Sequence, residues 1–177
     1  MMWRLDTKMF FSYFPKLLYP LDDSREVVTD IFRRVAPRDK FIVNETYLDK
    51  YVLKAGERPE DIAYQLYGDA ELHWVILLLN NIIDPYNEWY YTPEQVEAMV
   101  KQRYGENNAN ATNHWASTDR PEICVDYDAE KLASGEIFEV SHLEHELIEN
   151  DARQEIKILH PRYLNNFVTE FRELIKQ

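Results

Sequence analysis

The chain has almost no cysteine and no long apolar run. Cys124 is the single cysteine in 177 residues, so no disulfide can form within the chain and its stability does not depend on an oxidising compartment. The apolar run Val75–Leu79 is far shorter than the roughly 20 residues that cross a bilayer. Met1–Tyr19 is apolar and aromatic, but it is interrupted by charges and has no small-residue cleavage site. We therefore expect a soluble protein that is made in the cytosol.

Positive charge is also in short supply. Lys and Arg total 20 against 32 Asp and Glu, which gives a formal net charge of −12. Phosphate backbones are bound by clustered Lys and Arg, so nucleic acid is excluded as a partner, and an anionic membrane surface is disfavoured for the same reason. The length suits one domain with a proper core, or a small module with substantial arms.

The stretch from Tyr51 to Asn81 carries the clearest pattern. Tyr51–Leu53 is β-prone and is followed by Gly56, which can take a positive φ without steric cost. Pro59 then suits the first position of a helix, and Gly68 suits the position just after its end. The pattern predicts a strand, a turn and a short amphipathic helix.

A second helix should follow Asp69, whose carboxylate can accept hydrogen bonds from the first free N–H groups of that helix. This helix is apolar on two opposite stripes. One stripe consists of Leu72, Val75, Ile76 and Leu79, and the other of Trp74, Leu77 and Leu78. A strand and one short helix can cover only one stripe. The other is covered either by flanking segments of the same chain or by another protein.

The segments on either side of this module are predicted to form arms. Met9–Leu21 is dense in aromatics and contains two prolines, which favours an extended segment. Val27–Val35 could be a strand or a short helix, and we expect a strand or irregular extended structure. Trp89–Tyr91 is a short β-prone run that could pair with Tyr51–Leu53.

The next segments alternate between regular and irregular patterns. Thr92 opens a capping box for a helix that should end near Tyr104. The Asn-rich stretch Gly105–Ala116 is the best candidate for a mobile loop. Glu122–Tyr127 and Ile137–Val140 could form two short strands of a small hairpin arm.

The C-terminal region regains a regular pattern. Ser141 opens a second capping box for a charged helix that continues to about Arg153, Ile156–Leu159 looks like a strand, and Pro161 starts a final helix. The apolar seam of that helix has spacings of three, four and three residues, at Leu164, Phe167, Phe171 and Leu174. It docks either on its own domain or on a neighbouring protein.

No set of catalytic or metal-binding residues stands out. His142 and His145 with Glu146 have the wrong spacing for a zinc protease helix. Asp126 and Asp128 resemble the start of a calcium loop, but the positions that need Gly and Glu hold Lys131 and Ile137 instead. We expect Cys124 to be inert, and we expect a chain that is not an enzyme and has no cofactor and no metal.

Several of these blocks together resemble a known family. They are the Pro59–Ala63 helix start with Tyr67-Gly68, the run Leu72–Leu77, the exit Asn80–Tyr86 with Trp89, the stretch Thr29–Arg34 and the region Glu144–Tyr163. The sequence resembles the LysM-containing baseplate wedge subunits of T-even-type contractile-tailed phages, the gene product 53 family. The matches are scattered over most of the chain, whereas the Asn-rich loop and His114–Val140 match nothing.

This resemblance implies a structural virion protein of the tail baseplate, assembled in the host cytoplasm. It would join wedge subunits and bridge adjacent wedges, its partners being other baseplate wedge proteins. The alternative is a LysM-type module that binds peptidoglycan or another glycan.

The expected fold class is α+β, a small LysM-like βααβ module with an extended N-terminal arm and a C-terminal helical and strand extension. The segments expected are an arm at 1–46, the module and following helix at 47–104, a loop and small β arm at 105–140, and a helix-strand-helix at 141–177. Aromatic and large apolar anchors dominate many interfaces. The partner-binding residues predicted on this basis are Phe10, Phe11, Tyr13, Phe14, Trp74, Leu78, Trp89, Leu164, Phe167, Phe171 and Leu174.

Overall fold

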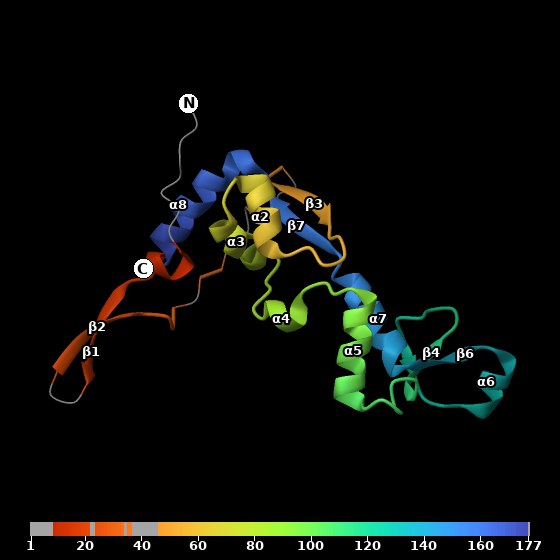
Figure 1. The fold of residues 1–177 in the computed structure, drawn as a ribbon. Helices are drawn as coiled ribbons and strands as arrows, with labels where there is room; N and C mark the ends of the chain where they lie inside the picture. Colours follow the sequence, from red (N-terminus) through yellow and green to blue (C-terminus); the bar gives the residue numbers. More distant parts are fainter. Residues whose placement is uncertain (1–8, 22–23, 34, 37–45, 177) are drawn as a thin grey trace. The chain divides into compact units, whose positions relative to one another are not determined.

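A computed structural model describes residues 9–21, 24–33, 35–36 and 46–176 of the chain (Figure 1). The chain divides into two compact units. Unit 1 comprises Met1–Glu88 and Glu155–Gln177, and unit 2 comprises Trp89–Gln154, so unit 2 lies within the sequence of unit 1. Helices and strands occur together, which confirms the α+β class. The four segments expected from the sequence stay a prediction.

One sheet of unit 1 pairs two strands that are distant in sequence. Strand β3 (Leu48–Val52) runs antiparallel to β7 (Glu155–Leu159), with Tyr51 opposite Ile156. The expected pairing of Tyr51–Leu53 with Trp89–Tyr91 is therefore wrong. Trp89–Tyr91 is not a strand, because the N–H and the C=O of Tyr91 are instead hydrogen-bonded to the side chain of Asn150 at 2.8 and 3.0 Å.

The helices that follow β3 form as their sequence dictates. Helix α2 (Pro59–Tyr67) begins with Pro59 and ends at Gly68, whose φ of 76° is easy only for glycine. Asp69 then caps a 3-10 turn, η2 (Ala70–Leu72), by accepting a hydrogen bond from the N–H of Glu71. The turn continues into α3 (His73–Leu79), which packs against both α2 and β7. The predicted strand, turn and two helices are confirmed.

The N-terminal segment is only partly extended. Strands β1 (Lys16–Leu21) and β2 (Ser24–Thr29) form an antiparallel hairpin, in agreement with the extended structure predicted for this region. Phe10–Tyr13, however, is a 3-10 turn, η1, rather than an extended run. The turn brings its aromatic rings to one side, where they pack on one another and on Trp74. Proline restricts only the residue before it, and Phe14 before Pro15 is indeed extended, so the 3-10 turn at Phe10–Tyr13 does not conflict with the prolines.

The C-terminal segment completes the core of unit 1. A 3-10 turn, η3 (Pro161–Tyr163), leads into α8 (Leu164–Leu174). The apolar face of α8 packs into one cluster with η1, α3 and β7, and this cluster is the largest part of the core. Its buried members include Tyr13, Phe14, Leu72, Trp74, Val75, Leu79, Leu159, Leu164, Phe167, Val168, Phe171 and Ile175. A short helix, α4 (Pro85–Glu88), follows α3 at the end of the first part of unit 1.

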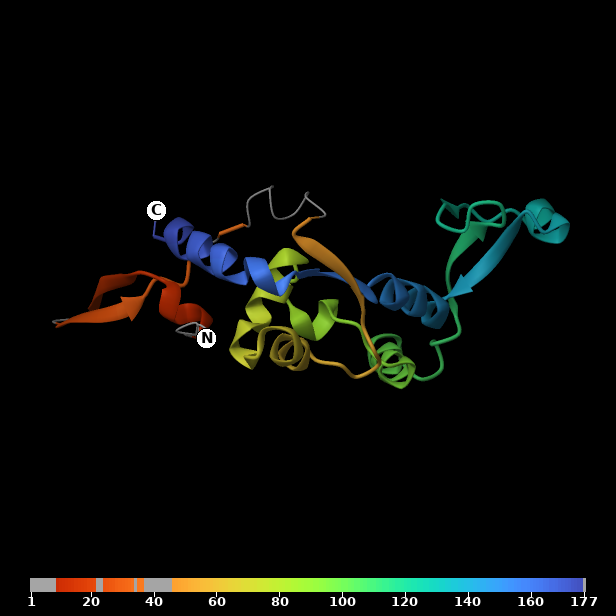
Figure 2. The same ribbon diagram turned by 90° about the horizontal axis from the view of Figure 1, so that it is seen from above.

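Unit 2 is built on two helices and a three-stranded sheet. Helix α5 (Pro93–Tyr104) and helix α7 (His142–Ala152) pack together, and each starts with the predicted capping box, at Thr92 and Ser141. The sheet has the order β5-β4-β6, from β4 (Thr112–Ser117), β5 (Cys124–Val125) and β6 (Ile137–Ser141), and Figure 2 shows β4 beside β6. A short helix, α6 (Ala129–Ser134), connects β5 to β6.

Two expectations for unit 2 need correction. The stretch Gly105–Ala116 is not a loop throughout, because from Thr112 it forms the central strand of the sheet. The predicted strand Glu122–Tyr127 is reduced to two residues, since only Cys124 and Val125 pair with β4. The predicted strand at Ile137–Val140 is confirmed as β6.

No helix in the described residues is long and apolar enough to span a membrane.

Candidate interaction surface

Three aromatic rings join η1, α3 and α8 in unit 1. The ring centroids of Trp74 and Phe171 are 4.6 Å apart, and the ring of Phe10 lies 5.4 Å from Trp74 and 5.6 Å from Phe171. Such distances are typical of stabilising aromatic pairs. The guanidinium carbon of Arg172 lies 4.8 Å from the centroid of the Tyr13 ring and so adds a cation–π contact to the same junction. The N-terminal turn is therefore held against the two helices by its aromatic side chains.

The end of α3 is fixed by two consecutive asparagines, Asn80 and Asn81. Asn81 has a φ of 54°, and the N–H of Ile82 donates to the C=O of Leu77 at 2.9 Å while the N–H of Asn81 donates to Leu78 at 3.3 Å. These bonds form a Schellman motif, which ends a helix with one residue in the left-handed region. Asparagine tolerates this region better than most residues. The motif turns the chain sharply after Leu79.

Asn80 ties this helix end to the sheet. Its side-chain amide donates to the C=O of Ile76 at 2.9 Å and to the C=O of Lys157 at 2.7 Å, and its side-chain oxygen accepts from the N–H of Lys157 at 2.8 Å. The side chain thus mimics a strand residue beside β7. Because the end of α3 is fixed, the next residues, Ile82 and Ile83, are held in a defined place.

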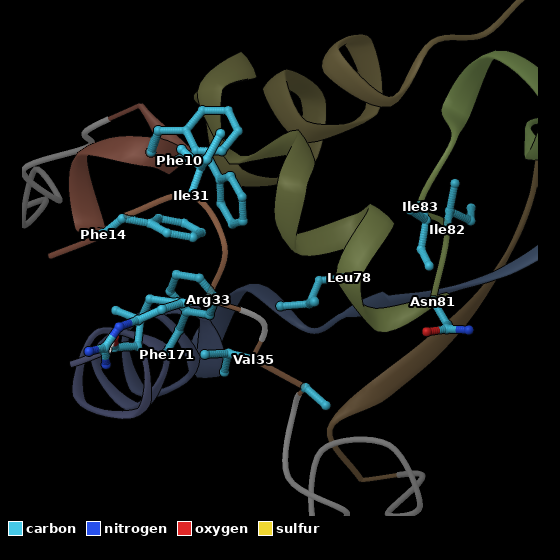
Figure 3. A pocket seen from close by; sticks show the side chains of 13 residues that line it. Phe10, Phe14, Ile31, Arg33, Val35, Leu78, Asn81, Ile82, Ile83 and Phe171 are labelled. Atoms are coloured by element: carbon cyan, nitrogen blue, oxygen red, sulfur yellow. Dashed lines mark hydrogen bonds between the residues drawn. The ribbon is translucent and has the colours of Figure 1, made fainter. Parts of the chain in front are cut away.

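An apolar groove lies between these elements (Figure 3). Its cavity is about 230 Å³ and is lined from η1, from the segment after β2, from the end of α3 and from α8. The lining residues are Phe10, Phe11, Phe14, Ile31, Arg33, Val35, Ala36, Leu78, Asn81, Ile82, Ile83, Phe171 and Ile175. We call this surface the aromatic groove.

A second hollow adjoins the aromatic groove on the other side of Phe10 and Phe11. It has a volume of about 360 Å³ and shares Leu78, Ile82 and Ile83 with the groove. Its remaining lining residues are Met9, Glu71, His73, Trp74 and Leu77. The two hollows therefore form one continuous apolar surface over the ends of η1 and α3.

Large apolar side chains on this surface are open to solvent. Phe11 is 54% exposed, Ile83 is 68% exposed and Met9 is 69% exposed. The principal charged group of the groove, Arg33, is engaged within the chain, since its guanidinium pairs with Asp30 at 2.9 Å and donates to the C=O of Ile175 at 3.3 Å. Exposed apolar surface with few polar groups is typical of sites where another protein docks.

The structure brings most of the predicted partner-binding residues together. Tyr13, Phe14, Trp74, Leu164, Phe167 and Phe171 are buried in the core of unit 1, and Phe10 and Leu78 pack against them while half-buried. Leu174 is half-buried at the end of α8, and Phe11 is exposed. Trp89 is buried in unit 2 and so lies outside the groove. Their role in binding a partner stays a prediction.

Sequence reasoning missed Ile31, Ile82 and Ile83 as surface residues. Ile31 follows the β1–β2 hairpin, where the N–H of Ile31 bonds to the C=O of Thr29 at 3.0 Å. A signal for the other two was present, because a pair of asparagines after an apolar helix marks a left-handed helix end and thereby a change of chain direction. Apolar residues just beyond such an end are placed by the turn rather than by the helix.

The polar side chains singled out in the sequence have local structural roles. The side chain of Asn113 links His142 and His114, each at 2.8 Å, and the ring of His142 stacks on Tyr104 at 4.0 Å. Asp128 caps α6 by accepting from the N–H groups of Glu130 and Lys131. The described residues contain no group of three or more His, Cys, Asp or Glu side chains placed to hold a metal ion.

An α+β chain with an exposed apolar groove and few convergent polar groups has the features of a protein that works by contact with other proteins. Comparison with known proteins gives the family. The sequence model described as "Base plate wedge protein 53" matches residues 9–116, more than half of the chain, so the chain belongs to the base plate wedge protein 53 family. It is also similar to baseplate wedge protein gp53 of Enterobacteria phage T4, with 26% identity over an alignment 190 positions long that covers 96% of this chain and 97% of the relative.

Proposed function

We propose that the protein is a structural component of the wedge of a contractile phage tail baseplate, where it joins wedge subunits and bridges adjacent wedges. Membership of the base plate wedge protein 53 family and similarity along nearly the whole of the phage T4 protein support this function. The baseplate of the tail is then its place in the virion, and other baseplate proteins are its partners. We infer no catalytic role and no role in binding nucleic acid.

The exposed apolar surface over η1 and α3 carries this proposal. The groove and the adjoining hollow expose Met9, Phe11 and Ile83 side by side with half-buried Leu78. Covering a fully exposed side chain of this size contributes about 1.5–3 kcal/mol. A partner that covers two or three of them gains several kcal/mol from this surface, in addition to its other contacts with the chain.

Substitution at the rim of the groove tests the proposal. Phe11 and Ile83 are exposed, so Phe11→Asp and Ile83→Asp should leave the fold intact while placing a charge on the docking surface. Tyr64→Asp is the matched control, because Tyr64 on α2 is 66% exposed and does not line either hollow. The full chain would be co-expressed with the other wedge subunits, and its incorporation measured by sedimentation.

Loss of incorporation in both groove variants, with normal incorporation of the Tyr64 variant, is the expected result. Normal incorporation of all three would show that the groove does not hold the wedge. Phe167→Asp and Phe171→Asp are unsuitable for this purpose, since both side chains are buried in the core and the charge would unfold unit 1.

We propose further that unit 1 contains a LysM-like module interrupted by unit 2. Strand β3, helices α2 and α3, and strand β7 follow one another as βααβ, and β3 pairs antiparallel with β7. Unit 2 occupies the connection between α3 and β7. A LysM-like module of this kind would serve as a frame for the groove rather than as a sugar-binding site.

The glycan-binding alternative finds less support in the local chemistry. The regions where a LysM groove would lie are Ala55–Arg58 and Asn80–Ile83. In the first region, the carboxylate of Glu57 accepts hydrogen bonds from the hydroxyl of Tyr51 at 2.7 Å and from the N–H of Lys54 at 3.1 Å. Burial of the Tyr51 hydroxyl and its hydrogen bond to Glu57 raise the pKa of Tyr51 to about 12. In the second, Asn80 is occupied by β7.

Calorimetric titration with chitin and peptidoglycan oligomers separates the two functions. We expect no saturable heat from the full chain. An Ala55→Trp variant would block the turn after β3. Saturable binding by the unmodified chain that is lost in this variant would instead favour glycan binding as the function.

A further inference from the structure

The β1–β2 hairpin exposes apolar side chains on both of its faces. Paired residues of an antiparallel hairpin share a face, and successive residues alternate between faces. One face carries Leu17, Tyr19, Leu21 and Val28, and the other carries Leu18 and Val27. Each of these six side chains is at least 36% exposed. An isolated two-stranded hairpin is marginal in water and becomes stable when further strands or a cover are added.

The base of the hairpin is nevertheless tied to the core of unit 1. Arg33, just beyond β2, pairs with Asp30 at the foot of the hairpin and donates to the C=O of Ile175 at the end of α8. The hairpin is therefore attached at its foot, while the apolar side chains along its length are exposed. Figure 1 shows the backbone of its two strands.

The backbone groups on the two outer edges of the hairpin follow from its register. The N–H of Asp30 donates to the C=O of Pro15 at 2.9 Å, so Pro15 and Asp30 form a hydrogen-bonded pair. Bonded and non-bonded pairs alternate along an antiparallel ladder. The pairs whose N–H and C=O groups point outward are then Lys16–Thr29, Leu18–Val27 and Pro20–Arg25.

The two edges differ in what they offer to another strand. On the β1 edge, Pro20 has no N–H, so one of the outward donors is lost. On the β2 edge, Arg25 and Val27 each present both an N–H and a C=O, and Thr29 presents its N–H, while its C=O accepts from the N–H of Ile31 at 3.0 Å. The β2 edge is thus the better template for strand addition, and it ends at Thr29.

We propose that the outer edge of β2 accepts an antiparallel strand from another protein of the wedge, which extends the hairpin to a three-stranded sheet. The side chains of β2 define the chemistry of that strand. Arg25 calls for an acidic residue opposite it, Glu26 for a basic residue, and Val27 and Val28 for apolar residues. Along the added strand the order is apolar, apolar, basic, acidic. This inference rests on the proposed function.

Val27→Pro tests the proposal with little cost to the hairpin itself. The N–H of Val27 points outward, so proline removes a donor offered to the partner without removing a bond between β1 and β2. Leu18→Pro is the matched control, because Leu18 lies opposite Val27 and its N–H points to the other edge. Each full-length variant would be co-expressed with the other wedge subunits, and its incorporation measured by sedimentation.

We expect Val27→Pro to weaken incorporation about tenfold or more and Leu18→Pro to change it little. Equal effects of the two variants, whether both bind or both fail, would overturn the assignment of the β2 edge. Hydrogen exchange of the Leu17 and Val28 amides, which point inward, shows in each free variant that the hairpin is intact.

Hydrogen exchange of the unmodified chain gives a second, independent readout. In the free chain the amides of Arg25, Val27 and Thr29 should exchange rapidly, and in the assembled wedge they should be protected while those of Lys16 and Leu18 are not. A chain that enters the wedge with the β2 amides still exchanging rapidly would overturn the strand addition alone. A chain that never enters the wedge would overturn the proposed function instead. A free chain that sediments as a dimer with these amides already protected would make a second copy the occupant, contrary to the proposal.

Discussion

The two units divide the negative charge of the chain unevenly. Unit 2 has 14 Asp and Glu against five Lys and Arg, a net charge of −9, which leaves −3 of the total −12 for unit 1. Exposed aromatic and large apolar side chains have the opposite bias, since 14 of the 19 in the described residues belong to unit 1 and five, Tyr127 and Ile148 among them, belong to unit 2. The units therefore present very different surfaces to their surroundings.

The interiors of the two units differ in the same sense. Unit 1 is centred on the ring cluster of η1, α3 and α8, whereas unit 2 has a small apolar cluster around Val96 and Val100 and its helices are also joined by buried polar side chains. The carboxylate of Glu146 accepts from Arg103 at 2.5 Å and from the hydroxyl of Tyr104 at 3.1 Å, and the side chain of Asn150 pairs with the backbone of Tyr91. Glu146 and Asn150 are the buried polar residues of the described chain.

This difference is consistent with the proposal that unit 1 is the unit that docks on other proteins. Buried polar pairs are satisfied inside unit 2 and fix its geometry without any partner. Unit 1 exposes apolar surface to solvent. Burial of this surface against another protein would favour binding through the hydrophobic effect. An acidic surface adds little affinity, but it disfavours contact with other acidic surfaces and so restricts where the chain can dock.

The largest predicted effect is on the core of unit 1. Trp74→Ala should cost about 3–5 kcal/mol in the free energy of unfolding, because it empties the centre of the ring cluster. Trp74→Phe should cost far less, since it keeps a ring and removes an indole N–H that is buried without an acceptor among the described residues. Urea unfolding measures the change in the free energy of unfolding of each variant, and hydrogen exchange shows which amides lose protection.

The exchange pattern shows whether the contrast between the units holds in solution. In Trp74→Ala the amides of unit 1 should lose protection while those of α5 and α7 keep theirs. Equal loss of protection throughout the chain would mean that the two units unfold as one.

The second prediction concerns the polar interior of unit 2. Asn150→Leu should cost about 1–3 kcal/mol, because it removes the two hydrogen bonds, at 2.8 and 3.0 Å, that the buried Asn150 side chain makes to the N–H and C=O of the half-buried Tyr91. Glu149→Gln on the exposed side of α7 is the control and should be neutral. Thermal unfolding would be compared between the two variants, and a neutral Asn150→Leu would show that the polar pair does not hold unit 2 together.

The smallest predicted effect is at the start of α7 and depends on pH. Glu144 accepts hydrogen bonds from the backbone N–H and from the hydroxyl of Ser141, and these bonds lower the pKa of Glu144 below its ordinary value of 4.5. A carboxylate whose pKa is lowered by folding stabilises the folded state at higher pH, and this contribution is lost as the pH falls through the folded-state pKa.

Ser141→Ala should therefore cost about 1 kcal/mol at neutral pH, and the difference from the unmodified chain should narrow as the pH falls below 4.5. Ser141→Thr keeps the hydroxyl and should retain most of the stability. Unfolding at a series of pH values checks the trend, and a difference that grows on acidification would contradict it.

Local signals in the sequence were sufficient for most helices and their ends. Pro59 and Gly68 bound α2, and Thr92 and Ser141 start α5 and α7, because the residues that satisfy free N–H groups at a helix end lie within three positions of it. The strand at Ile156–Leu159 was also predicted, since alternation and flanking turns are local features.

Pairing between distant segments was beyond those signals. The partner of β3 is β7 and not Trp89–Tyr91, and nothing in either strand states that a whole unit lies between them. The same holds for β4: its residues Thr112–Ala116 were predicted to lie in the Asn-rich loop, because the sequence does not show that β5 and β6 pair with the two edges of this strand. Only part of the groove was predicted from the sequence. Its aromatic side chains were predicted as contact residues, but Ile82 and Ile83 were not, because the turn that places them depends on the hydrogen bonds between Asn80 and β7.

The pairing of β3 with β7 also sets the order in which the nascent chain can fold. Leu48 and its partner Leu159 are 111 positions apart. During translation β3, α2 and α3 are therefore synthesised first, and β3 cannot pair with β7 until all of unit 2 has been synthesised. Contacts of such high sequence separation form slowly. Unit 2 can complete its own sheet and helices first, and the aromatic groove, which is proposed to dock on the wedge, therefore forms last, after most of the polypeptide has been translated.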